Sequence, residues 1–393
     1  MTKVIMSWCL VGFLIRLLAL FATHIYSVQA GFGGFFPLEA GNDDILYWDL
    51  ATEALAGTLR ADNPNSYAYF LGLLFSLFGQ DLILGKFVNV LFSVASIYFS
   101  LKIAKLFLDK NIHISDSINR KSLMWLGVVL ALYPSSILYS TQLVRDSLMQ
   151  FLGIICVYFL VRFIRRPSIA PLILVVASLF LLYGLRPYLV FGILAAVIVF
   201  VIFIWNMKLV PKIGIVSLLF VFVAIVPNFL GLGFFGINYI QKFANTEFLT
   251  AFRQDAYSIG GSSVGLEINY SNPIAFLATF SPSFLTVMFG PFPWQIKSAA
   301  QLIALPEALF MLSLFGYWLK GFSNLKKLDS SSILFLGGLF ITSLIAIYSD
   351  NIGTNTRLRI LPWSLFLIFV SLHIKAPLSS LKRFNFPKIV SKI

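Results

Sequence analysis

The sequence has little charge and few side chains that hold metals or form disulfides. Charged residues make up 11% of its 393 positions, and there are two cysteines and three histidines. Cys9 and Cys156 lie inside apolar runs, which favours small core side chains over a disulfide or a thiolate metal site. No phosphate-binding loop, nucleotide-binding glycine fingerprint or serine-hydrolase elbow occurs in a suitable context. We therefore expect neither a disulfide-stapled secreted scaffold nor ATP hydrolysis within this chain.

Apolar residues dominate instead. Hydrophobic residues make up 59% of the chain, Phe alone numbers 41, and the mean hydropathy is +0.89. Apolar runs of about 18 to 25 residues recur, and each is long enough to cross a hydrocarbon layer about 30 Å thick. The sequence thus predicts an all-α polytopic membrane protein with a single transmembrane domain over 1–393. The ten predicted spans are 4–23, 81–101, 122–141, 143–161, 169–185, 188–206, 213–230, 301–319, 332–348 and 360–374.

The basic residues predict the orientation of these spans. The net charge is +13, but the basic residues lie in short joints between apolar runs, so a nucleic-acid partner is not expected. They occupy every second joint, whereas nearly all of the 16 acids fall in the other joints. By the positive-inside rule both termini are cytoplasmic, and the long segments 24–80 and 231–300 face the outside of a plasma membrane. We expect the first run to stay as a span, although Ser27–Ala30 is similar to a signal-peptidase site.

The first outer segment carries an acidic pair at the start of a predicted helix. Asp43 and Asp44 precede an amphipathic stretch over about 45–58, which we expect to lie on the membrane. The apolar stretch 67–78 is too short to cross, and it is expected to form a re-entrant or interfacial helix. Two adjacent carboxylates suit a general base, a divalent-metal ligand or a helix N-terminal cap, and the residues alone leave all three open.

Arginines stand on the outer side, where positive charge is otherwise avoided. Arg145 and Asp146 fall together in a tight outer turn, and Arg186 lies in the next outer turn. Arg357 and Arg359 precede the last span. A planar guanidinium binds phosphate through two parallel hydrogen bonds, so a lipid-linked phosphate or diphosphate is a natural partner. The alternatives are ion pairs with neighbouring acids that only anchor the turns, and contacts with phospholipid headgroups.

The order of these features along the first half of the chain is informative. A first span is followed by Asp43 and Asp44 with Tyr47 and Ala51, by an interfacial helix, by a short apolar stretch that ends at Gly79, and by the Arg145–Asp146 turn. This order resembles the GT-C superfamily of integral-membrane glycosyltransferases, especially the bacterial relatives of protein mannosyltransferases and aminoarabinose transferases. The resemblance covers about residues 1–190 and reappears at Arg357–Arg359.

The resemblance implies a transferase that works on the extracytoplasmic face. Its catalytic base or metal contact would be Asp43 or Asp44, with Asp146 as a second acid and with or without a divalent metal ion. The donor would be a sugar on a polyprenyl phosphate, and attack opposite the leaving phosphate predicts inversion at C1. The residues expected to bind the donor phosphate or to frame its lipid-facing entrance are Tyr47, Arg145, Arg186, Arg357 and Arg359.

Two departures from the family pattern bear on the acceptor. The acidic pair is Asp-Asp rather than Asp-Glu, and no sizeable soluble domain follows the last span. The second departure favours a glycan or lipid acceptor over a protein. Two other functions stay open: a polymerase or ligase that moves an undecaprenyl-diphosphate-linked oligosaccharide, and a lipid or sugar transporter without covalent chemistry. A transporter predicts charges near the membrane midplane, whereas most charges here gather at one side.

Overall fold

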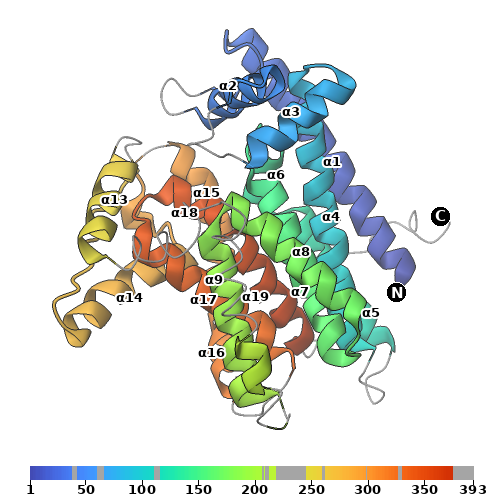
Figure 1. Ribbon diagram of the computed structural model, residues 1–393, viewed down its shortest axis with the longest axis vertical. Coiled ribbons are helices and arrows are strands. Elements are labelled where there is room, and N and C mark those ends of the chain that lie inside the picture. Colours follow the sequence, from blue (N-terminus) through green and yellow to red (C-terminus); the bar gives the residue numbers. More distant parts are fainter. Residues whose placement is uncertain are drawn as a thin grey trace.

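The computed structural model describes the chain as a bundle of helices (Figure 1). No β-strand is present in the described part, where an isolated bridge joins Ser263 to Asn351. The described residues are 1–37, 42–59, 66–109, 116–205, 208, 212–217, 245–258, 262–297, 299–325 and 330–374.

Four helices are long and apolar enough to cross a membrane. These are α1 (Thr2–Gln29), α4 (Leu82–Leu108), α7 (Asp146–Arg165), and α9 (Pro187–Val199) continued by the π-helical η1 (Phe200–Ile204). A fifth span is possible if α5 (Asp116–Ala131) and α6 (Pro134–Ser140) are taken together, although they are bent by 49°. Pro134 is the reason for the break, because proline cannot donate a backbone hydrogen bond and keeps the preceding residue out of helix.

The remaining apolar helices are shorter than a full span. A helix of 17 residues is only about 25 Å long, less than the hydrocarbon layer. Among the described residues, four or five spans therefore meet the test of length and composition, where hydropathy predicted ten. The predicted span 213–230 lies mostly outside the described residues. The shorter helices are α3 (Ser66–Phe78), α8 (Ile169–Leu185), α14 (Pro273–Phe289), α15 (Ala299–Ser313), α16 (Phe315–Leu325), α17 (Ser332–Tyr348) and α19 (Ile360–His373).

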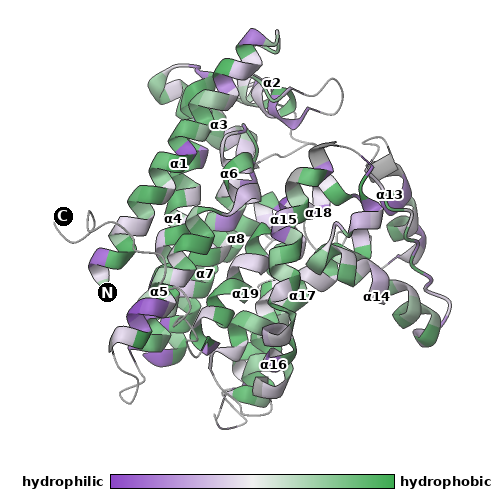
Figure 2. Cartoon of the chain, turned by 180° about the vertical axis from the view of Figure 1, so that it is seen from behind, coloured by the Kyte–Doolittle hydropathy of each residue, from purple (hydrophilic) through white to green (hydrophobic). Residues whose placement is uncertain are grey.

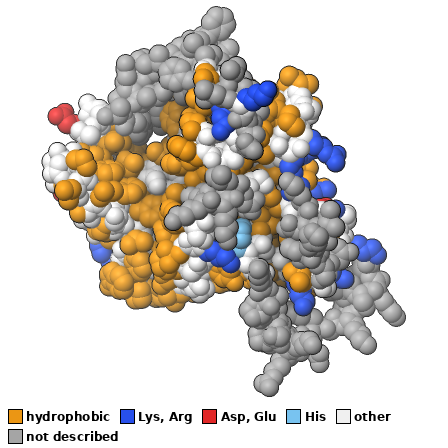
Figure 3. Space-filling view, turned by 90° about the horizontal axis from the view of Figure 1, so that it is seen from below, with side chains coloured by type: hydrophobic (Ala, Val, Ile, Leu, Met, Phe, Trp, Pro, Cys, Tyr) orange, Lys and Arg blue, Asp and Glu red, His pale blue; other side chains and the backbone are white. Residues whose placement is uncertain are grey.

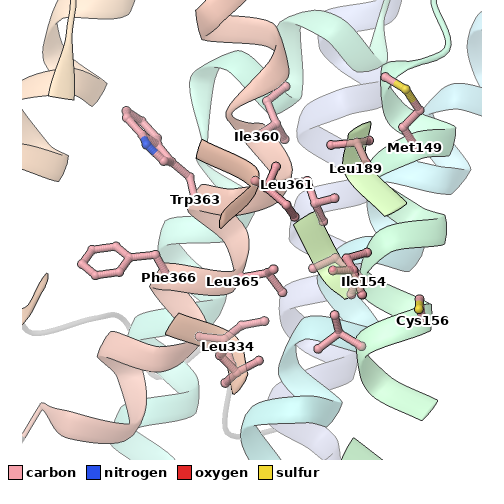
Figure 4. Packing of buried hydrophobic residues seen from close by; sticks show 14 of the residues in the cluster. Met149, Ile154, Cys156, Leu189, Leu334, Ile360, Leu361, Trp363, Leu365 and Phe366 are labelled. Atoms are coloured by element: carbon pink, nitrogen blue, oxygen red, sulfur yellow. The ribbon is translucent and has the colours of Figure 1, made fainter. Parts of the chain in front are cut away.

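Helix α19 forms the centre of the core. Every residue from Ile360 to Ser371 is buried, and the helix packs against α17, α4, α5 and α7. Trp363 and Phe366 leave it on the side opposite to Leu361 and Leu365 (Figure 4). Close approach is possible where small residues face the partner helix: a Cβ on Gly153 of α7 would lie 2.5 Å from Leu361. Small residues at helix crossings are typical of membrane bundles.

Helices that are not candidate spans cover two regions of the bundle. Helices α2 (Asp43–Ala56) and α3 pack together at one end, at the top of Figure 1. Helix α13 (Thr246–Ser258) and α14 lie to one side, within the long segment 231–300. Apolar residues dominate the middle of the bundle (Figure 2), and α14 itself is apolar and packs on α17. The opposite end, seen in Figure 3, presents Lys and Arg side chains and few acids.

Arg16 of α1 is buried, and no acid of the described residues forms an ion pair with it. Its guanidinium makes five hydrogen bonds, to the hydroxyls of Ser93 and Ser136 and to the carbonyl oxygens of Gly12, Leu130 and Ala131. The last two carbonyls belong to the end of α5, where helix geometry leaves backbone acceptors unpaired and where the helix dipole favours a cation. Arg16 thus stabilises the break between α5 and α6.

Replacing Arg16 by methionine should destabilise the fold. The carbonyls at the end of α5 would lose their donors in an apolar environment, at a cost of about 2–4 kcal/mol. The thermal unfolding midpoint of the purified protein should fall clearly below that of wild type. Arg120→Met, at an exposed position of α5, is the matched control and should leave the midpoint unchanged. An Arg16→Met protein as stable as the control would contradict this role.

Candidate functional site

Six residues singled out in the sequence come together between the ends of four helices. They lie at the start of α2, in the turn between α6 and α7, at the junction of α8 and α9, and in α18 (Ile352–Leu358). We call this group the Arg357 cluster. It consists of Asp43, Tyr47, Arg145, Asp146, Arg186 and Arg357.

Local sequence places these side chains at helix ends. Asn42 caps α2, since its side chain accepts a hydrogen bond from the amide of Asp44, and Asn351 caps α18 in the same way. Arg186 precedes Pro187, and a residue before proline is kept in an extended conformation. Pro187 itself occupies the first helical position of α9. Asp146 opens α7, where the helix dipole favours a carboxylate. The cluster is therefore built from the starts of α2, α7 and α9 and from the last turn of α18, which converge at one end of the bundle.

Arg357 is the centre of the cluster. It forms an ion pair with Asp43 and a second one with Asp146, whose Oδ2 lies 3.4 Å from Nε of Arg357. Burial acts to lower the pKa of Arg357, but the charges of Asp146 and then Asp43 outweigh it and raise this pKa above its ordinary value. The two carboxylates differ in access, because the side chain of Asp43 is 35% exposed and that of Asp146 only 4%. Asp43 is thus the carboxylate that an incoming molecule can reach.

Asp146 keeps one oxygen without a partner. Its Oδ1 is buried and accepts no hydrogen bond from the described residues. Leaving a buried acceptor unpaired costs about 1–3 kcal/mol, so native proteins pair nearly all of them. Such an oxygen inside a charged cluster indicates a place for a donor group that the protein itself does not supply.

Arg145 and Arg186 also have unused donors. Arg145 donates to the carbonyl of Leu185 at 3.0 Å and lies over the ring of Tyr47, but its Nε has no partner among the described residues. The guanidinium of Arg186 lies over the ring of Tyr188, and its Nε has no partner within that part of the chain. Burial and then the neighbouring charge of Arg186 lower the pKa of Arg145. Two partly buried guanidinium groups that repel each other are what a bound anion would stabilise.

Asn89 positions the turn that carries Arg145 and Asp146. Its amide donates to the carbonyls of Gln142 and Val144, at 2.8 and 2.9 Å, and to the hydroxyl of Tyr67 at 2.9 Å. The sequence analysis missed this residue. The available signal was an asparagine inside the long apolar run of α4, because amides in such runs are costly unless they bind something.

Asp44 has a different role from Asp43. Its side chain is 1% exposed, and it accepts hydrogen bonds from the amides of Phe36 (3.1 Å) and Leu143 (2.8 Å). Lys86 of α4 lies 3.2 Å away and also donates to the carbonyl of Gly34. Burial raises the pKa of Asp44, while Lys86 and the two amides act to lower it. The carboxylate therefore joins three segments and has no oxygen free for a substrate.

Arg359 lies apart from the Arg357 cluster. It is 1% exposed, and its guanidinium donates to Glu307 at 2.9 Å and to the carbonyl of Gly290 while stacking over Trp363. Glu307 also accepts hydrogen bonds from the amide and hydroxyl of Ser135, at 3.0 and 2.6 Å. This network connects α15, α6 and α19 and leaves Nε of Arg359 without a partner among the described residues, so Arg359 contributes to the packing of the bundle.

Among the described residues, no three His, Cys, Asp or Glu side chains come together in a group that could hold a metal ion. Asp43 and Asp146 are the acids expected to share a cation, and Arg357 stands between them. The guanidinium of Arg357 already compensates the negative charge of these two carboxylates, which is what a bound metal ion would do.

Comparisons with known proteins found no match among protein-family models, curated proteins or solved structures. The geometry of the Arg357 cluster therefore has to carry the assignment of a function.

Asp44→Asn and Asp43→Asn should separate the two neighbouring acids. Asp44→Asn leaves Lys86 buried without its counter-ion, which should cost about 3–5 kcal/mol and lower the thermal unfolding midpoint. Asp43→Asn removes a partly exposed carboxylate and should change stability by less than about 1 kcal/mol. Equal midpoints for the two variants would show that Asp44 is not the structural member of the pair.

Proposed function

We propose that this protein is a polytopic membrane glycosyltransferase of the GT-C type. It transfers a sugar from a polyprenyl-phosphate donor to a glycan or lipid acceptor, on the extracytoplasmic face of the plasma membrane. The observation that carries the proposal is the Arg357 cluster itself: two carboxylates, one of them with an open oxygen, beside three arginines at one end of an apolar bundle. A carboxylate can accept the proton of the acceptor hydroxyl, and arginines can stabilise the charge on the leaving phosphate.

The distribution of charge supports the orientation. The described basic residues outside the cluster concentrate at the ends of α4, α7 and η1 and at the start of α5, away from α2 and α3. By the positive-inside rule that end faces the cytoplasm, so the Arg357 cluster faces outward. In this proposal α8, α17 and α19 also cross, α15 and α16 together form the predicted span 301–319, and the predicted span 213–230, which lies mostly outside the described residues, is the tenth. A helix that is shorter than the hydrocarbon layer can cross when a second helix continues it, as α16 follows α15.

The proposed reaction is a displacement at C1 of the donor sugar. The acceptor hydroxyl attacks C1 from the face opposite the phosphate, and its proton passes to a carboxylate of Asp43, the more accessible acid. The C1–O bond to phosphate breaks, and the bonding electrons stay on the phosphate oxygen. Charge that develops on this oxygen is stabilised by Arg145, Arg186 and Arg357. Attack from the opposite face inverts the configuration at C1.

Asp146 acts on Arg357 in this scheme. Its Oδ2 holds the guanidinium from the buried side, so Arg357 keeps its place when Asp43 turns to the acceptor. The open Oδ1 is available to a hydroxyl of the donor sugar. The ring of Tyr47 packs edge-on against Tyr67, and the guanidinium of Arg145 lies over this ring. The contact keeps Arg145 from moving into the bundle.

Sugar transfer by the purified protein in nanodiscs tests the proposal. With radiolabelled polyprenyl-phosphate sugars and a lipid-glycan extract as acceptor, Asp43→Asn should lower kcat at least about 100-fold, the usual contribution of a positioned proton acceptor. Asp146→Asn should also lower kcat, because Arg357 loses the carboxylate that holds it. Asp49→Asn, an exposed acid on the same helix as Asp43, is the matched control and should keep wild-type activity. The anomeric configuration of the product, read by NMR, should be inverted relative to the donor.

Arg186 should be tested separately, because it contacts the donor phosphate and takes no part in the proton transfer. Arg186→Ala should raise the KM for the donor about tenfold or more, the effect of losing a charge-assisted hydrogen bond, and Arg186→Lys should recover part of the loss. A donor KM that stays at the wild-type value in Arg186→Ala would remove this residue from the site.

Other outcomes of the transfer assay would change the assignment. Chain growth by whole repeat units with a diphosphate-linked oligosaccharide, and no turnover of monosaccharide donors, would identify a polymerase. Binding of either lipid without turnover would favour a transporter. Full activity in both Asp43→Asn and Asp146→Asn would overturn the proposed site.

A further inference from the structure

A second polar cavity lies away from the Arg357 cluster, between α13 and the segment that leads into α14. Its volume is about 740 Å³, within the range of roughly 300–1,000 Å³ that small-molecule sites occupy. We call it the α13 hollow. Its lining residues are Thr246, Glu247, Thr250, Ala251, Gln254, Glu267, Ile268, Asn269, Tyr270 and Thr279.

The lining has the chemistry of a carbohydrate site and lacks that of a phosphate site. Amides and carboxylates such as Gln254 and Glu267 bind neighbouring hydroxyls in pairs, and Tyr270 adds an aromatic surface. The hydroxyl of Tyr270 is buried and has no partner among the described residues. Among the described lining residues there is neither Lys nor Arg, whereas there are two glutamates. An anionic ligand would be repelled here, and a neutral hydroxyl-rich one would not.

One wall of the hollow, residues 267–270, directly follows a segment that buried charges hold in place and that lines the smaller hollow beside it. Asp350 accepts hydrogen bonds from the hydroxyl of Ser263 at 2.6 Å and from the amides of Gly265 and Leu266 at 2.9 and 3.2 Å. Arg253 of α13 donates to the carbonyl of Leu266 at 2.9 Å and lies 3.6 Å from Asp350. A pre-formed wall lowers the entropy that a ligand loses on binding. A further hollow of about 280 Å³, which shares Gln254 and Glu267, adjoins it.

The same segment connects directly to the helix that carries Arg357. Ser263 forms a β-bridge with Asn351, and the amide of Ile352 donates to the carbonyl of Ser262 at 3.0 Å. Ile352 is the first residue of α18, so a backbone contact joins the hollow to the helix that carries Arg357. Occupation of the hollow would thereby affect the position of that helix.

We propose that the α13 hollow binds a neutral saccharide, as the site that recognises the acceptor glycan. This rests on the proposed function, and it divides the substrates by charge: the anionic donor goes to the arginines of the Arg357 cluster, and the uncharged acceptor goes to the hollow. The adjoining smaller hollow gives room for a second sugar unit, which indicates an oligosaccharide rather than a monosaccharide.

Direct binding to the full chain in nanodiscs tests the inference without turnover. The probes are a panel of neutral tri- to pentasaccharides and an oligogalacturonate of matched length, measured by saturation-transfer NMR and titration calorimetry. We expect binding of a neutral member and none of the oligogalacturonate. Tyr270→Phe should weaken binding about three- to tenfold, the effect of one hydrogen bond, and Thr250→Trp should abolish it by filling the hollow. Ser271→Trp, an exposed neighbour that does not line the hollow, should bind as wild type.

The outcomes separate this inference from the proposed function. Neutral saccharide binding that Thr250→Trp removes, even without sugar transfer, supports the hollow as a saccharide site while the transferase assignment fails. Sugar transfer with an acceptor KM that is the same in wild type, Tyr270→Phe and Thr250→Trp overturns the hollow while the transferase assignment stands. Absence of binding across the panel, or tighter binding of the oligogalacturonate, also overturns it.

Discussion

The burial of charge in an apolar helical bundle is the constraint on which the rest of this structure depends. A charged group without water has to find its partner inside the protein, since an unpaired one costs several kcal/mol. Each deeply buried charge outside the Arg357 cluster meets this requirement by joining segments that are distant in sequence. The closed networks are Arg16 with the end of α5, Asp44 with Lys86, Arg359 with Glu307, and Arg253 with Asp350.

The Arg357 cluster differs from these networks because one of its carboxylates is not fully used. Glu307, for example, receives donors from Ser135 and Arg359 on both oxygens, whereas Asp146 keeps a buried oxygen open. Nε of Arg186 also has no partner in the described part of the chain. Nε of Arg359 is unpaired there too, but its other guanidinium nitrogens bind Glu307 and the carbonyl of Gly290. The Arg357 cluster thus combines an open carboxylate oxygen with open guanidinium donors, which a ligand would complete.

The positions of the two polar regions connect binding and chemistry. Asp350 and Asn351 hold the segment that leads into the wall of the α13 hollow, and α18 starts at the next residue and ends just beyond Arg357. The backbone contact of this segment and the ion pairs of Arg357 therefore lie near opposite ends of one helix of seven residues.

The sequence by itself determined the helical class, the membrane character and the residue types of the site. Long apolar runs can satisfy their backbone only as helices, and arginines on the outer side needed a partner, so Asp43, Arg145 and Asp146 were identified from pattern alone. Only the tertiary structure decided which of these residues meet. Asp43 and Arg357 are 314 residues apart and form an ion pair, while the adjacent Asp44 turns to Lys86 and Arg359 to Glu307. Side-chain direction at a helix start depends on which helices pack there, and hydropathy carries no information about that packing.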